Sequence, residues 1–453
     1  MKASTRVLTL LCAFLSSATF SIFGQGSLTP PGPPSVTMKT LDQVQPRIPI
    51  NDINTPGNTD DTFAINQPGS YYLTGNIPVT KTNGIHVTVS GVTIDLSGYK
   101  IGRIFAQFGS GILIDATANR CTVQNGTVTG FAYGVQAASA GGTLSHLAAS
   151  ITTTVGFAVA SGWNLEGCIS HANDGMGIVA GSGCVLSNCI AFNNGDVGIK
   201  TGSACALTNC TATNNSATGI DVGNGTLTNC VGSDNVGTAE AGIKAGESST
   251  LLNCVANGNT ARAGIYALFG SSLTNCSANN NTSASSTSAG IETAAGCTVS
   301  HCSVFFTNST AAHTNSTGIG LMTSYRCTVS NCTVAANRGD GIRVTYQCHV
   351  FGNFCSNAGQ NGGDGAGIHS TAERNLIEDN DVTESTRGIE VASNNNLIIK
   401  NKVAHAFGTN YVIAFNNRYG PIIDIHLGGG AAVNGATAPS TLTSTDPWAN
   451  FSY

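Results

Sequence analysis

A row of ionisable and aromatic residues recurs through the second half of the chain, each directly after a Gly-Ile pair. If the Ile side chains point into a core, their successors point to solvent on the same sheet. The row then presents acids, bases and one aromatic ring at steps of about 4.8 Å, which would suit hydrogen bonding and stacking along an extended glycan. We therefore predict a substrate-binding strip formed by Lys200, Asp221, Lys244, Tyr266, Glu292, Arg343, His369 and Glu390.

This strip has a structural alternative. An exposed parallel sheet needs polar residues for solubility, and opposite charges in neighbouring coils stabilise the register. A glycoside hydrolase needs two carboxylates about 5–9.5 Å apart, whereas Asp221 and Glu292 would lie about 14 Å apart. A lyase needs a base and a cation, roles that Lys244 or Arg343 could fill. The sequence therefore assigns no catalytic residue.

The elements that must position the strip follow from the Gly-Ile repeat. The Gly is followed by Ile, or once each by Val135 and Phe157, and returns about every 21 to 28 residues, a period typical of solenoids. The residues that directly follow the first five pairs are His86, Leu113, Gln136, Ala158 and Val179, and a later pair is followed by Gly320. The repeated glycines are Gly84, Gly111, Gly134, Gly156, Gly177, Gly198, Gly219, Gly242, Gly264, Gly290, Gly318, Gly341, Gly367 and Gly388.

A second pattern lies between the Gly-Ile pairs, in segments such as CVLSNC (184–189), CALTNC (205–210) and CTVSNC (327–332). Their alternating small or apolar and polar residues indicate short strands. Three short strands in about 21–23 residues leave no room for a helix, and the consensus of leucine-rich repeats is absent. The sequence predicts an all-β fold, a single parallel β-helix solenoid of about fourteen coils with three short strands per coil and capped ends.

Asparagine columns mark the predicted corners of the coils. Left-handed backbone at a corner favours Gly and then Asn, and identical amides in stacked coils can bond each other. We interpret the column as a structural ladder, with an amide-lined ligand track as the alternative. Its members are Asn173, Asn194, Asn215, Asn235, Asn259, Asn281 and Asn337.

The sixteen cysteines form further columns. Stacked Cβ atoms about 4.8 Å apart are farther apart than a disulfide prefers, so we expect most thiols to be free, small and buried. In-coil disulfides Cys184–Cys189 and Cys205–Cys210 are one alternative, and a zinc site from the same four residues is another. The second column contains Cys168, Cys189, Cys210, Cys230, Cys254, Cys276, Cys302 and Cys332.

The ends of the chain differ from the repeats. Lys2 and Arg6 precede an apolar run, which indicates a secretory signal peptide at residues 1–25 and a secreted, periplasmic or cell-surface location. Residues 26–60 would form a Pro/Gly-rich linker and N-terminal cap, 61–425 the β-helix, and 426–453 a low-complexity C-terminal tail. After signal removal no membrane span is expected. Only 9% of residues are charged and the net charge is −5, so we expect no nucleic-acid partner; the oligomeric state stays open.

The segments FAINQPGSYYLTGNI (63–77) and NGIHVTVSGVTIDLSG (83–98), with the recurring coils, resemble bacterial right-handed parallel β-helix repeat proteins of the pectin-lyase-like superfold. This resemblance covers about residues 60–425 and implies a polysaccharide-handling or surface protein. Asn58-Thr59-Asp60-Asp61 matches part of one polygalacturonase motif, but it precedes the first Gly-Ile coil, and the other enzyme motifs are missing. GGDGAG (362–367) resembles a single calcium nonapeptide. We therefore expect no metal or cofactor, with calcium left open.

The expected function is that of an exported β-helix protein that binds, or is presented to, extended polysaccharide. The alternatives are a polysaccharide lyase or glycoside hydrolase, and a purely structural or adhesive surface rod. Inserts in the longer coils are small and polar. Because sites on this architecture need walls, these inserts favour a binding or structural role over an enzyme.

Overall fold

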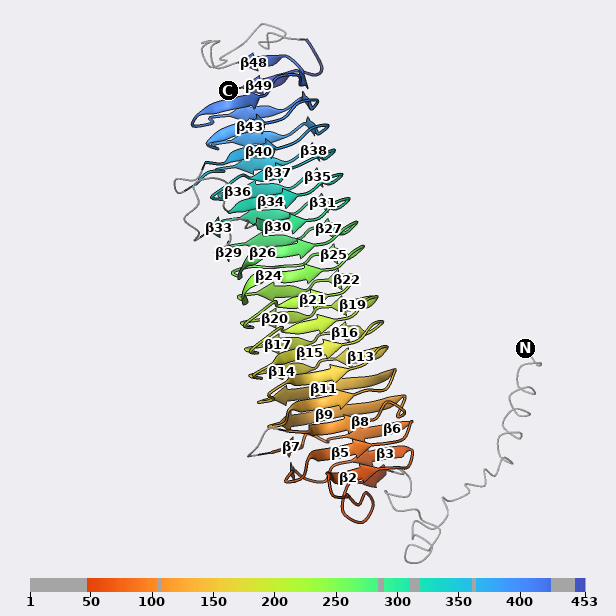
Figure 1. Ribbon diagram of the computed structural model, residues 1–453. Helices are drawn as coiled ribbons and strands as arrows, with labels where there is room; N and C mark the ends of the chain where they lie inside the picture. The colour runs from red at the N-terminus through yellow and green to blue at the C-terminus, as the bar shows by residue number, and fades with distance from the viewer. Residues whose placement is uncertain are drawn as a thin grey trace, which may run out of the picture. The chain divides into compact units, whose positions relative to one another are not determined.

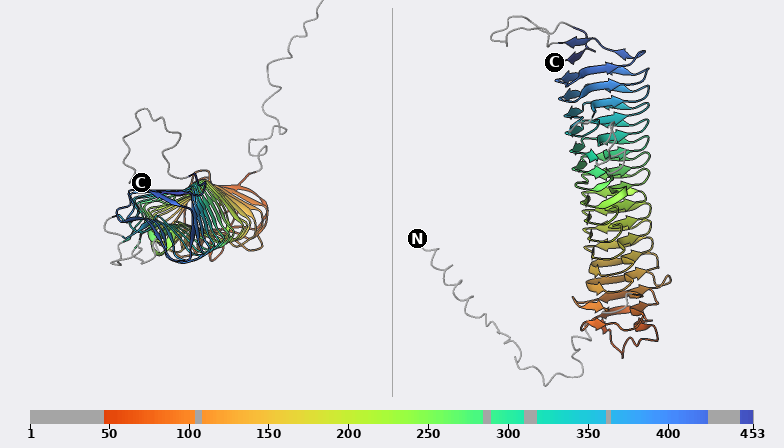
Figure 2. Two further views of the ribbon diagram at one scale, coloured as in Figure 1. Left: turned by 90° about the horizontal axis from the view of Figure 1, so that it is seen from above. Right: turned by 60° about the vertical axis from the view of Figure 1, so that its left-hand side comes forward.

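The computed structural model describes residues 47–103, 108–283, 289–309, 318–360, 364–424 and 445–452. The chain divides into a unit Met1–Arg47 and a unit Ile48–Tyr453. The predicted signal peptide, most of the predicted linker and residues 426–444 of the predicted tail lie outside the described residues. In the described residues there is no helix, and the unit Ile48–Tyr453 is an elongated stack of β-coils (Figures 1 and 2).

Three sheets run along the stack, and neighbouring strands within each sheet pair in parallel, as β10 (Tyr133–Ala137) does with β12 (Val155–Val159). The first sheet, which we call sheet 1, carries the Gly-Ile repeat. Its strands are β2 (Asp61–Ile65), β5 (Asn83–Val87), β8 (Ser110–Ile114), β10 (Tyr133–Ala137), β12 (Val155–Val159), β15 (Met176–Ala180), β18 (Ile199–Thr201), β21 (Ile220–Val222), β24 (Val236–Ala245), β26 (Thr260–Ala267), β29 (Thr282–Ser283), β30 (Ala289–Thr293), β33 (Asn308–Ser309), β34 (Ile319–Thr323), β37 (Ile342–Val344), β40 (Ala366–Ser370), β43 (Arg387–Val391) and β46 (Thr409–Ile413).

Sheet 2 follows sheet 1 within each coil. In the early coils it also contains the third strand, because β9 and β11 run through both positions without a break. Its strands are β1 (Arg47–Pro49), β3 (Gly69–Tyr72), β4 (Ile77–Pro78), β6 (Val92–Asp95), β7 (Lys100–Gly102), β9 (Cys121–Thr129), β11 (Gly142–Ser150), β13 (Trp163–Glu166), β14 (Ile169–His171), β16 (Val185–Ser187), β17 (Ile190–Phe192), β19 (Cys205–Thr208), β20 (Thr211–Thr213), β22 (Gly225–Thr228), β23 (Val231–Ser233), β25 (Thr250–Leu252), β27 (Ser272–Thr274), β31 (Thr298–Ser300), β35 (Thr328–Ser330), β38 (His349–Phe351), β41 (Leu376–Glu378), β44 (Leu397–Ile399) and β47 (Arg418–Tyr419).

Sheet 3 holds the third strands of the later coils. The end of the predicted C-terminal tail joins it, since β49 pairs with both β45 and β48. Its strands are β28 (Ser277–Asn279), β32 (Ser303–Phe305), β36 (Thr333–Ala335), β39 (Phe354–Ser356), β42 (Asp381–Thr383), β45 (Lys402–Ala404), β48 (Ile422–Asp424) and β49 (Asn450–Ser452).

The all-β solenoid with three strands per coil confirms the prediction, and it has about 16 turns where about 14 were expected. The two further turns begin at β2 and β46, which pair in register with their Gly-Ile neighbours. Phe63 and Tyr411 occupy the position of the repeated Ile there, so a search for Gly-Ile misses both turns.

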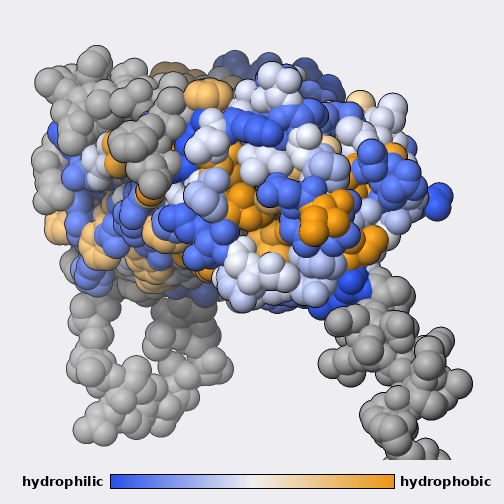
Figure 3. All heavy atoms as spheres, turned by 90° about the horizontal axis from the view of Figure 1, so that it is seen from below, coloured by the Kyte–Doolittle hydropathy of each residue, from blue (hydrophilic) through white to orange (hydrophobic). Residues whose placement is uncertain are grey.

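Seen from below in Figure 3, hydrophobic residues are visible near the middle of the N-terminal end, among hydrophilic ones.

Close packing explains the Gly-Ile pair. Ile220 is fully buried, as predicted, and stacks between Ile199 and Ile243. A Cβ atom on Gly198 would lie 2.6 Å from the amide of Asn215 and 2.7 Å from the carbonyl oxygen of Gly219, so a larger residue cannot fit. In one coil the predicted register is two residues too early. The position of the repeated Ile is taken by Leu321, which pairs with Ile291 and Ile342, and not by Ile319. The outward residue of this coil is therefore Met322 instead of Gly320.

The predicted asparagine ladder is present and buried from Asn173 to Asn281, whereas the side-chain nitrogen of its last predicted member, Asn337, has no hydrogen-bond partner in the described residues. The side-chain amide of Asn173 donates to Asn194 at 2.8 Å, and Asn194 donates to Asn215 at 2.9 Å. The predicted reason needs correction, because the left-handed residue is the one before each ladder Asn, for example Asn193 and Asn214. The ladder residues themselves are selected for stacking amides in the interior, where a polar group needs a partner.

The cysteine columns line the same interior. All fifteen cysteines of the described residues are free and buried, which confirms the stacked-thiol prediction over the in-coil disulfides. Each thiol of the second column donates to the carbonyl oxygen of a preceding coil, as Cys332 does to Val299 at 3.8 Å. In the next coil the column continues as Asn353, whose amide donates to Val329 at 3.0 Å. Thiol and amide therefore occupy the same corner and contact the same kind of carbonyl.

Candidate functional site

The eight predicted strip residues lie in one row on sheet 1, and we call this row the charged strip. Each pairs in register with the residue of the next coil, and Met322 fills the position between Glu292 and Arg343. The strip therefore runs without interruption from β18 to β43. In order along the stack it contains Lys200, Asp221, Lys244, Tyr266, Glu292, Met322, Arg343, His369 and Glu390.

The middle of the strip is tied together by a side chain that sequence inspection did not select. Arg262, on β26, donates from Nε to Glu292 Oε2 at 2.9 Å, makes a second contact with Oε1, and lies over the Tyr266 ring at 4.7 Å. The Glu292 side chain is only 7% exposed, so the expectation that it faces solvent is wrong. Arg262 therefore contacts both the Glu292 carboxylate and the ring of Tyr266, which is partly exposed.

Lys244 and Asp221 are partly exposed, with Nζ of Lys244 3.9 Å from Oδ1 of Asp221. Lys200, one coil before Asp221, is exposed. This half of the strip thus keeps polar groups of both signs accessible to a ligand, with weak mutual pairing.

The C-terminal part of the strip surrounds a buried carboxylate. Asp340, whose side chain is 1% exposed, accepts hydrogen bonds from Arg343 at 2.6 Å and pairs with His369 Nδ1 at 2.9 Å. Burial alone would raise the pKa of Asp340, but His369 and Arg343 outweigh it and lower the pKa. Glu390 accepts from Arg387 at 2.7 Å and lies 3.9 Å from His369 Nε2.

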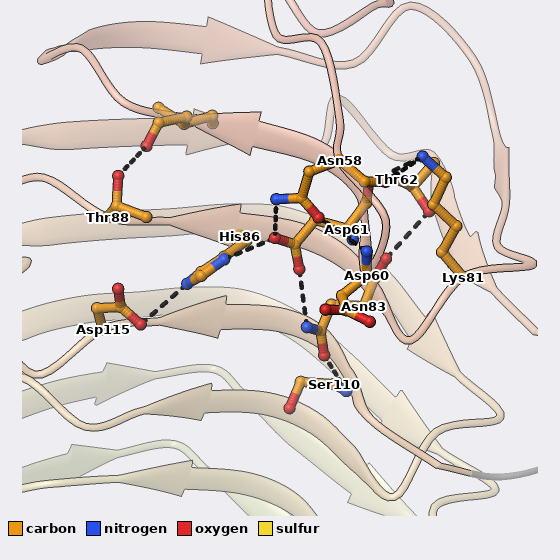
Figure 4. Close-up of polar contacts among 11 residues, drawn as sticks. Asn58, Asp60, Asp61, Thr62, Lys81, Asn83, His86, Thr88, Ser110 and Asp115 are labelled. Atoms are coloured by element: carbon orange, nitrogen blue, oxygen red, sulfur yellow. Dashed lines mark hydrogen bonds and ion pairs between the residues drawn. The ribbon is translucent and has the colours of Figure 1, made fainter.

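A similar arrangement lies at the N-terminal end of sheet 1 (Figure 4). The ring of His86 lies between two carboxylates, with Nδ1 2.8 Å from Asp61 Oδ2 and Nε2 2.9 Å from Asp115 Oδ1. His86 occupies the outward row of the strip, four coils before Val179. The Asp61 side chain is 4% exposed, whereas that of Asp115 is 40% exposed. One carboxylate is therefore fixed inside and the other reaches solvent.

Neutral amides hold Asp61 in place. Asn83 donates to Oδ1 at 2.8 Å and Asn58 donates to Oδ2 at 2.7 Å. Burial raises the pKa of Asp61, but these hydrogen bonds and the contact with His86 together lower the pKa by more than burial raises it. The net shift of the Asp61 pKa is therefore downward. Burial lowers the pKa of His86, but its bonds to Asp115 and Asp61 outweigh burial and raise it. These contacts therefore favour the ionised form of Asp61 and the protonated form of His86.

This cluster was not predicted as a site. The segment Asn58–Asp61 was noted but placed before the first coil, whereas Asp61 begins β2 of the actual first coil. A spacing rule could have found it: in both clusters an Asp three positions before the outward row meets the outward His of the next coil. Chemically, a buried Asp at Nδ1 orients the His ring, and in the N-terminal cluster Nε2 of that ring lies beside the partly exposed Asp115.

Comparisons with known proteins agree with the solenoid. Residues 110–261 match the family model described as "Right handed beta helix region", and residues 252–420 match "Periplasmic copper-binding protein (NosD)". No curated protein matches the sequence. The A-modules of the Azotobacter vinelandii mannuronan C-5 epimerases AlgE4 and AlgE6 are 14% and 13% identical, cover 77% and 78% of this chain and 90% and 91% of their own, and have a TM-score of 0.34. Pectate lyase Pel9A is 12% identical, with coverage of 73% and 70% and a TM-score of 0.26.

The described residues do not fit a copper site. Copper favours imidazole nitrogen and the sulfur of Cys or Met. In the segment matching the copper-binding description, the cysteines are buried, and thiols such as those of Cys332 and Cys348 donate to backbone carbonyls. His349 and His369 are paired with Glu378 and Asp340. No group of three His, Cys, Asp or Glu residues within the described ranges is arranged to hold a metal. The described residues also contain no helix long and apolar enough to cross a membrane.

Proposed function

Because this chain is a right-handed parallel β-helix repeat protein, we propose that it acts outside the cytoplasm by binding an extended polysaccharide along the charged strip. The observation that carries this proposal is the unbroken row of nine polar, ionisable or large side chains in consecutive coils of sheet 1. A linear glycan offers hydroxyl groups and ring faces at a regular repeat, and the strip offers donors, acceptors and one ring at steps of about 4.8 Å.

The charges of the strip favour a hydroxyl-rich ligand. Arg262 with Glu292, Lys244 with Asp221, and Arg343 with Asp340 form mixed-sign pairs, so the face carries no large excess of one sign. Paired ions still donate and accept hydrogen bonds, and they are held in place before the ligand arrives. The partly exposed ring of Tyr266 would supply the apolar contact with a sugar ring.

The test is a binding screen on a panel of neutral and acidic polysaccharides, read by affinity electrophoresis and calorimetry. Tyr266→Ala should abolish or sharply weaken binding to whichever polysaccharide the wild type retains, with little change in melting temperature. Tyr325→Ala is the matched control, since Tyr325 is 45% exposed and lies outside the strip. Unaltered binding by Tyr266→Ala, or no binding to any polysaccharide by the wild type, would leave the structural or adhesive rod as the better account.

A second candidate function is polysaccharide cleavage, and the observation that favours it is the Asp61–His86–Asp115 cluster. Its His86 Nε2 lies beside the partly exposed Asp115, and a lyase or hydrolase needs a group that can move a proton at such a position. The outward residues that follow, Leu113, Gln136 and Ala158, would form an uncharged track leading from this cluster toward the charged strip.

Product release by the same panel tests this second candidate. His86→Gln should remove cleavage while leaving binding at the strip unchanged, because the strip lies several coils away. His301→Asn is the control, since His301 is exposed and adopts the left-handed conformation that Asn tolerates. Cleavage that survives His86→Gln would exclude the cluster as the proton-transfer site.

A further inference from the structure

A hollow of about 440 Å³ lies on sheet 2 in the last two coils, away from the charged strip of sheet 1. Strands β44 and β47 form its floor, and the returning C-terminal segment forms one wall. A second hollow of about 560 Å³ adjoins it, and the two share Leu397 and Arg418. We call the pair the C-terminal hollow. Its size is that of a site for a small ligand.

Two aromatic rings face this hollow while half exposed: Tyr419 is 55% exposed and Trp448 is 49% exposed. The chain has two tryptophans, and the other one shows how the fold treats a structural ring. Trp163 is 1% exposed, and its indole N–H donates to the carbonyl oxygen of Ser139 at 2.8 Å. Across the described residues, the indole N–H of Trp448 makes no hydrogen bond. Exposed apolar rings cost free energy in water, and a concave site that presents them is typical of ligand binding.

The polar groups of the hollow are placed around these rings. Among the residues that the structure describes, the exposed guanidinium of Arg418 has no ion pair or hydrogen bond. The amide-bearing Asn395 and Asn416 line the adjoining part. Nζ of Lys400 lies over the Trp448 ring at 4.6 Å, and Asp446 accepts the backbone N–H of Trp448 at 2.8 Å. The Trp448 ring thus lies against a cation, with the guanidinium of Arg418 lining the same hollow.

We infer that the C-terminal hollow binds a saccharide. A sugar ring has an apolar face, which stacks on Trp448 and Tyr419, and a rim of oxygens, which Arg418 and Asn416 can reach as donors. Two adjoining hollows accommodate successive sugar residues of an oligosaccharide. The inference shares its ligand class with the proposed function, but it uses no residue of the charged strip. Arg418 can donate to hydroxyl or to carboxylate oxygens, so the neutral and acidic forms are separate arms of the test.

Trp448 makes the test direct, because acrylamide reaches it and not the buried Trp163. The probes are cellohexaose, chitohexaose and hexagalacturonate, added to the intact protein. At least one should protect Trp448, seen as a several-fold lower quenching slope, while the emission of Trp163 reports that the protein is folded. If hexagalacturonate is the ligand, protection should weaken with salt; if a neutral hexaose is the ligand, it should not.

Variants complete the test. Trp448→Ala and Arg418→Ala should each lose binding by calorimetry, whereas Trp448→Phe should retain most of it. Three results would overturn the inference: a free protein whose Trp448 is not quenched, no protection by any of the three probes, or full binding by Trp448→Ala. Tyr266→Ala should leave the Trp448 signal unchanged, so failure at the strip and failure at the hollow give different results.

Discussion

Two Asp–His units lie at opposite ends of sheet 1, and their surroundings differ more than their geometry. In each, a buried Asp contacts Nδ1 of the His in the next coil, at 2.8 Å for Asp61–His86 and 2.9 Å for Asp340–His369. The C-terminal unit is completed by the guanidinium groups of Arg343 and Arg387. The N-terminal unit is completed by amides and by a second carboxylate, Asp115.

This difference decides how each unit responds to pH. Arginine stays charged at every pH that a folded protein experiences, so Asp340 keeps a cationic partner whatever happens to His369. In the N-terminal unit, Lys81 donates to backbone carbonyls rather than to the carboxylates, and the titratable ring of His86 is the basic group that both carboxylates contact. At the C-terminal end, Asp340 therefore keeps a charged partner at every pH. At the N-terminal end, the strength of the Asp61–His86 contact depends on the protonation of His86.

The largest effect is expected for Asp340→Ala. It leaves Arg343 without its buried partner and the N–H of Ala366 without its acceptor, which should lower the free energy of unfolding by about 3–5 kcal/mol. Urea unfolding measures this loss. A loss below that of Asp61→Ala would contradict the comparison.

Asp61→Ala should lower the free energy of unfolding by less, about 1–3 kcal/mol. The substitution leaves the neutral amides of Asn58 and Asn83, rather than an arginine, without their hydrogen-bond acceptor. The same urea experiment measures it. Asp61→Asn is the matched control for shape, and it should recover part of the loss by keeping one acceptor for Asn83. No recovery would mean that the charge, and not the hydrogen bonding, is what His86 and the amides require.

The pH dependence of the protein's stability should arise mainly from the N-terminal unit. The pKa of His86 is raised, so its contribution is complete below the unfolded value of about 6.5 and is lost as pH rises through the folded-state pKa. The pKa of Asp61 is lowered, so its contribution is present above about 3.9 and is lost as pH falls through the folded-state pKa. Melting curves across pH should show a decline above neutrality that His86→Gln removes; an unchanged decline would contradict the assignment.

The smallest effect is expected for Glu390→Gln. Its carboxylate lies 3.9 Å from His369 and pairs with the partly exposed Arg387, and such pairs contribute about 0–1 kcal/mol. Urea unfolding at two salt concentrations should show a small, salt-dependent change. A larger cost would show that the C-terminal unit depends on Glu390 as the N-terminal unit depends on Asp115.

The sequence was sufficient for the coil and for the strip because both depend on residues at fixed positions in one repeat. Ile220 and the outward row were placed correctly by period alone. Prediction failed where another residue took the place of Gly-Ile, as at Phe63 and Tyr411, and where Gly318 shifted the apparent register.

The Asp–His units and Arg262 were missed for a different reason. Their partners come from neighbouring coils and from a position three or four residues before the outward row, so contacts such as Arg262–Glu292 span 30 residues. Alternation along a single strand carries no information about them. The burial of Glu292 and the C-terminal hollow likewise depend on which side chains of adjacent coils meet, which only the assembled stack determines.

The buried asparagine ladder has a consequence for how such a chain can grow. Successive rungs of the buried ladder, such as Asn173, Asn194 and Asn215, are separated by 21 residues, and the side chain of each rung bonds to that of the next. A duplicated 21-residue stretch would therefore bring its own rung, its own glycine contact and its own outward residue, and would meet matching neighbours on both sides. Length, and with it the number of positions available to a ligand, is thus a property that tandem duplication can change in whole coils without redesign of the core.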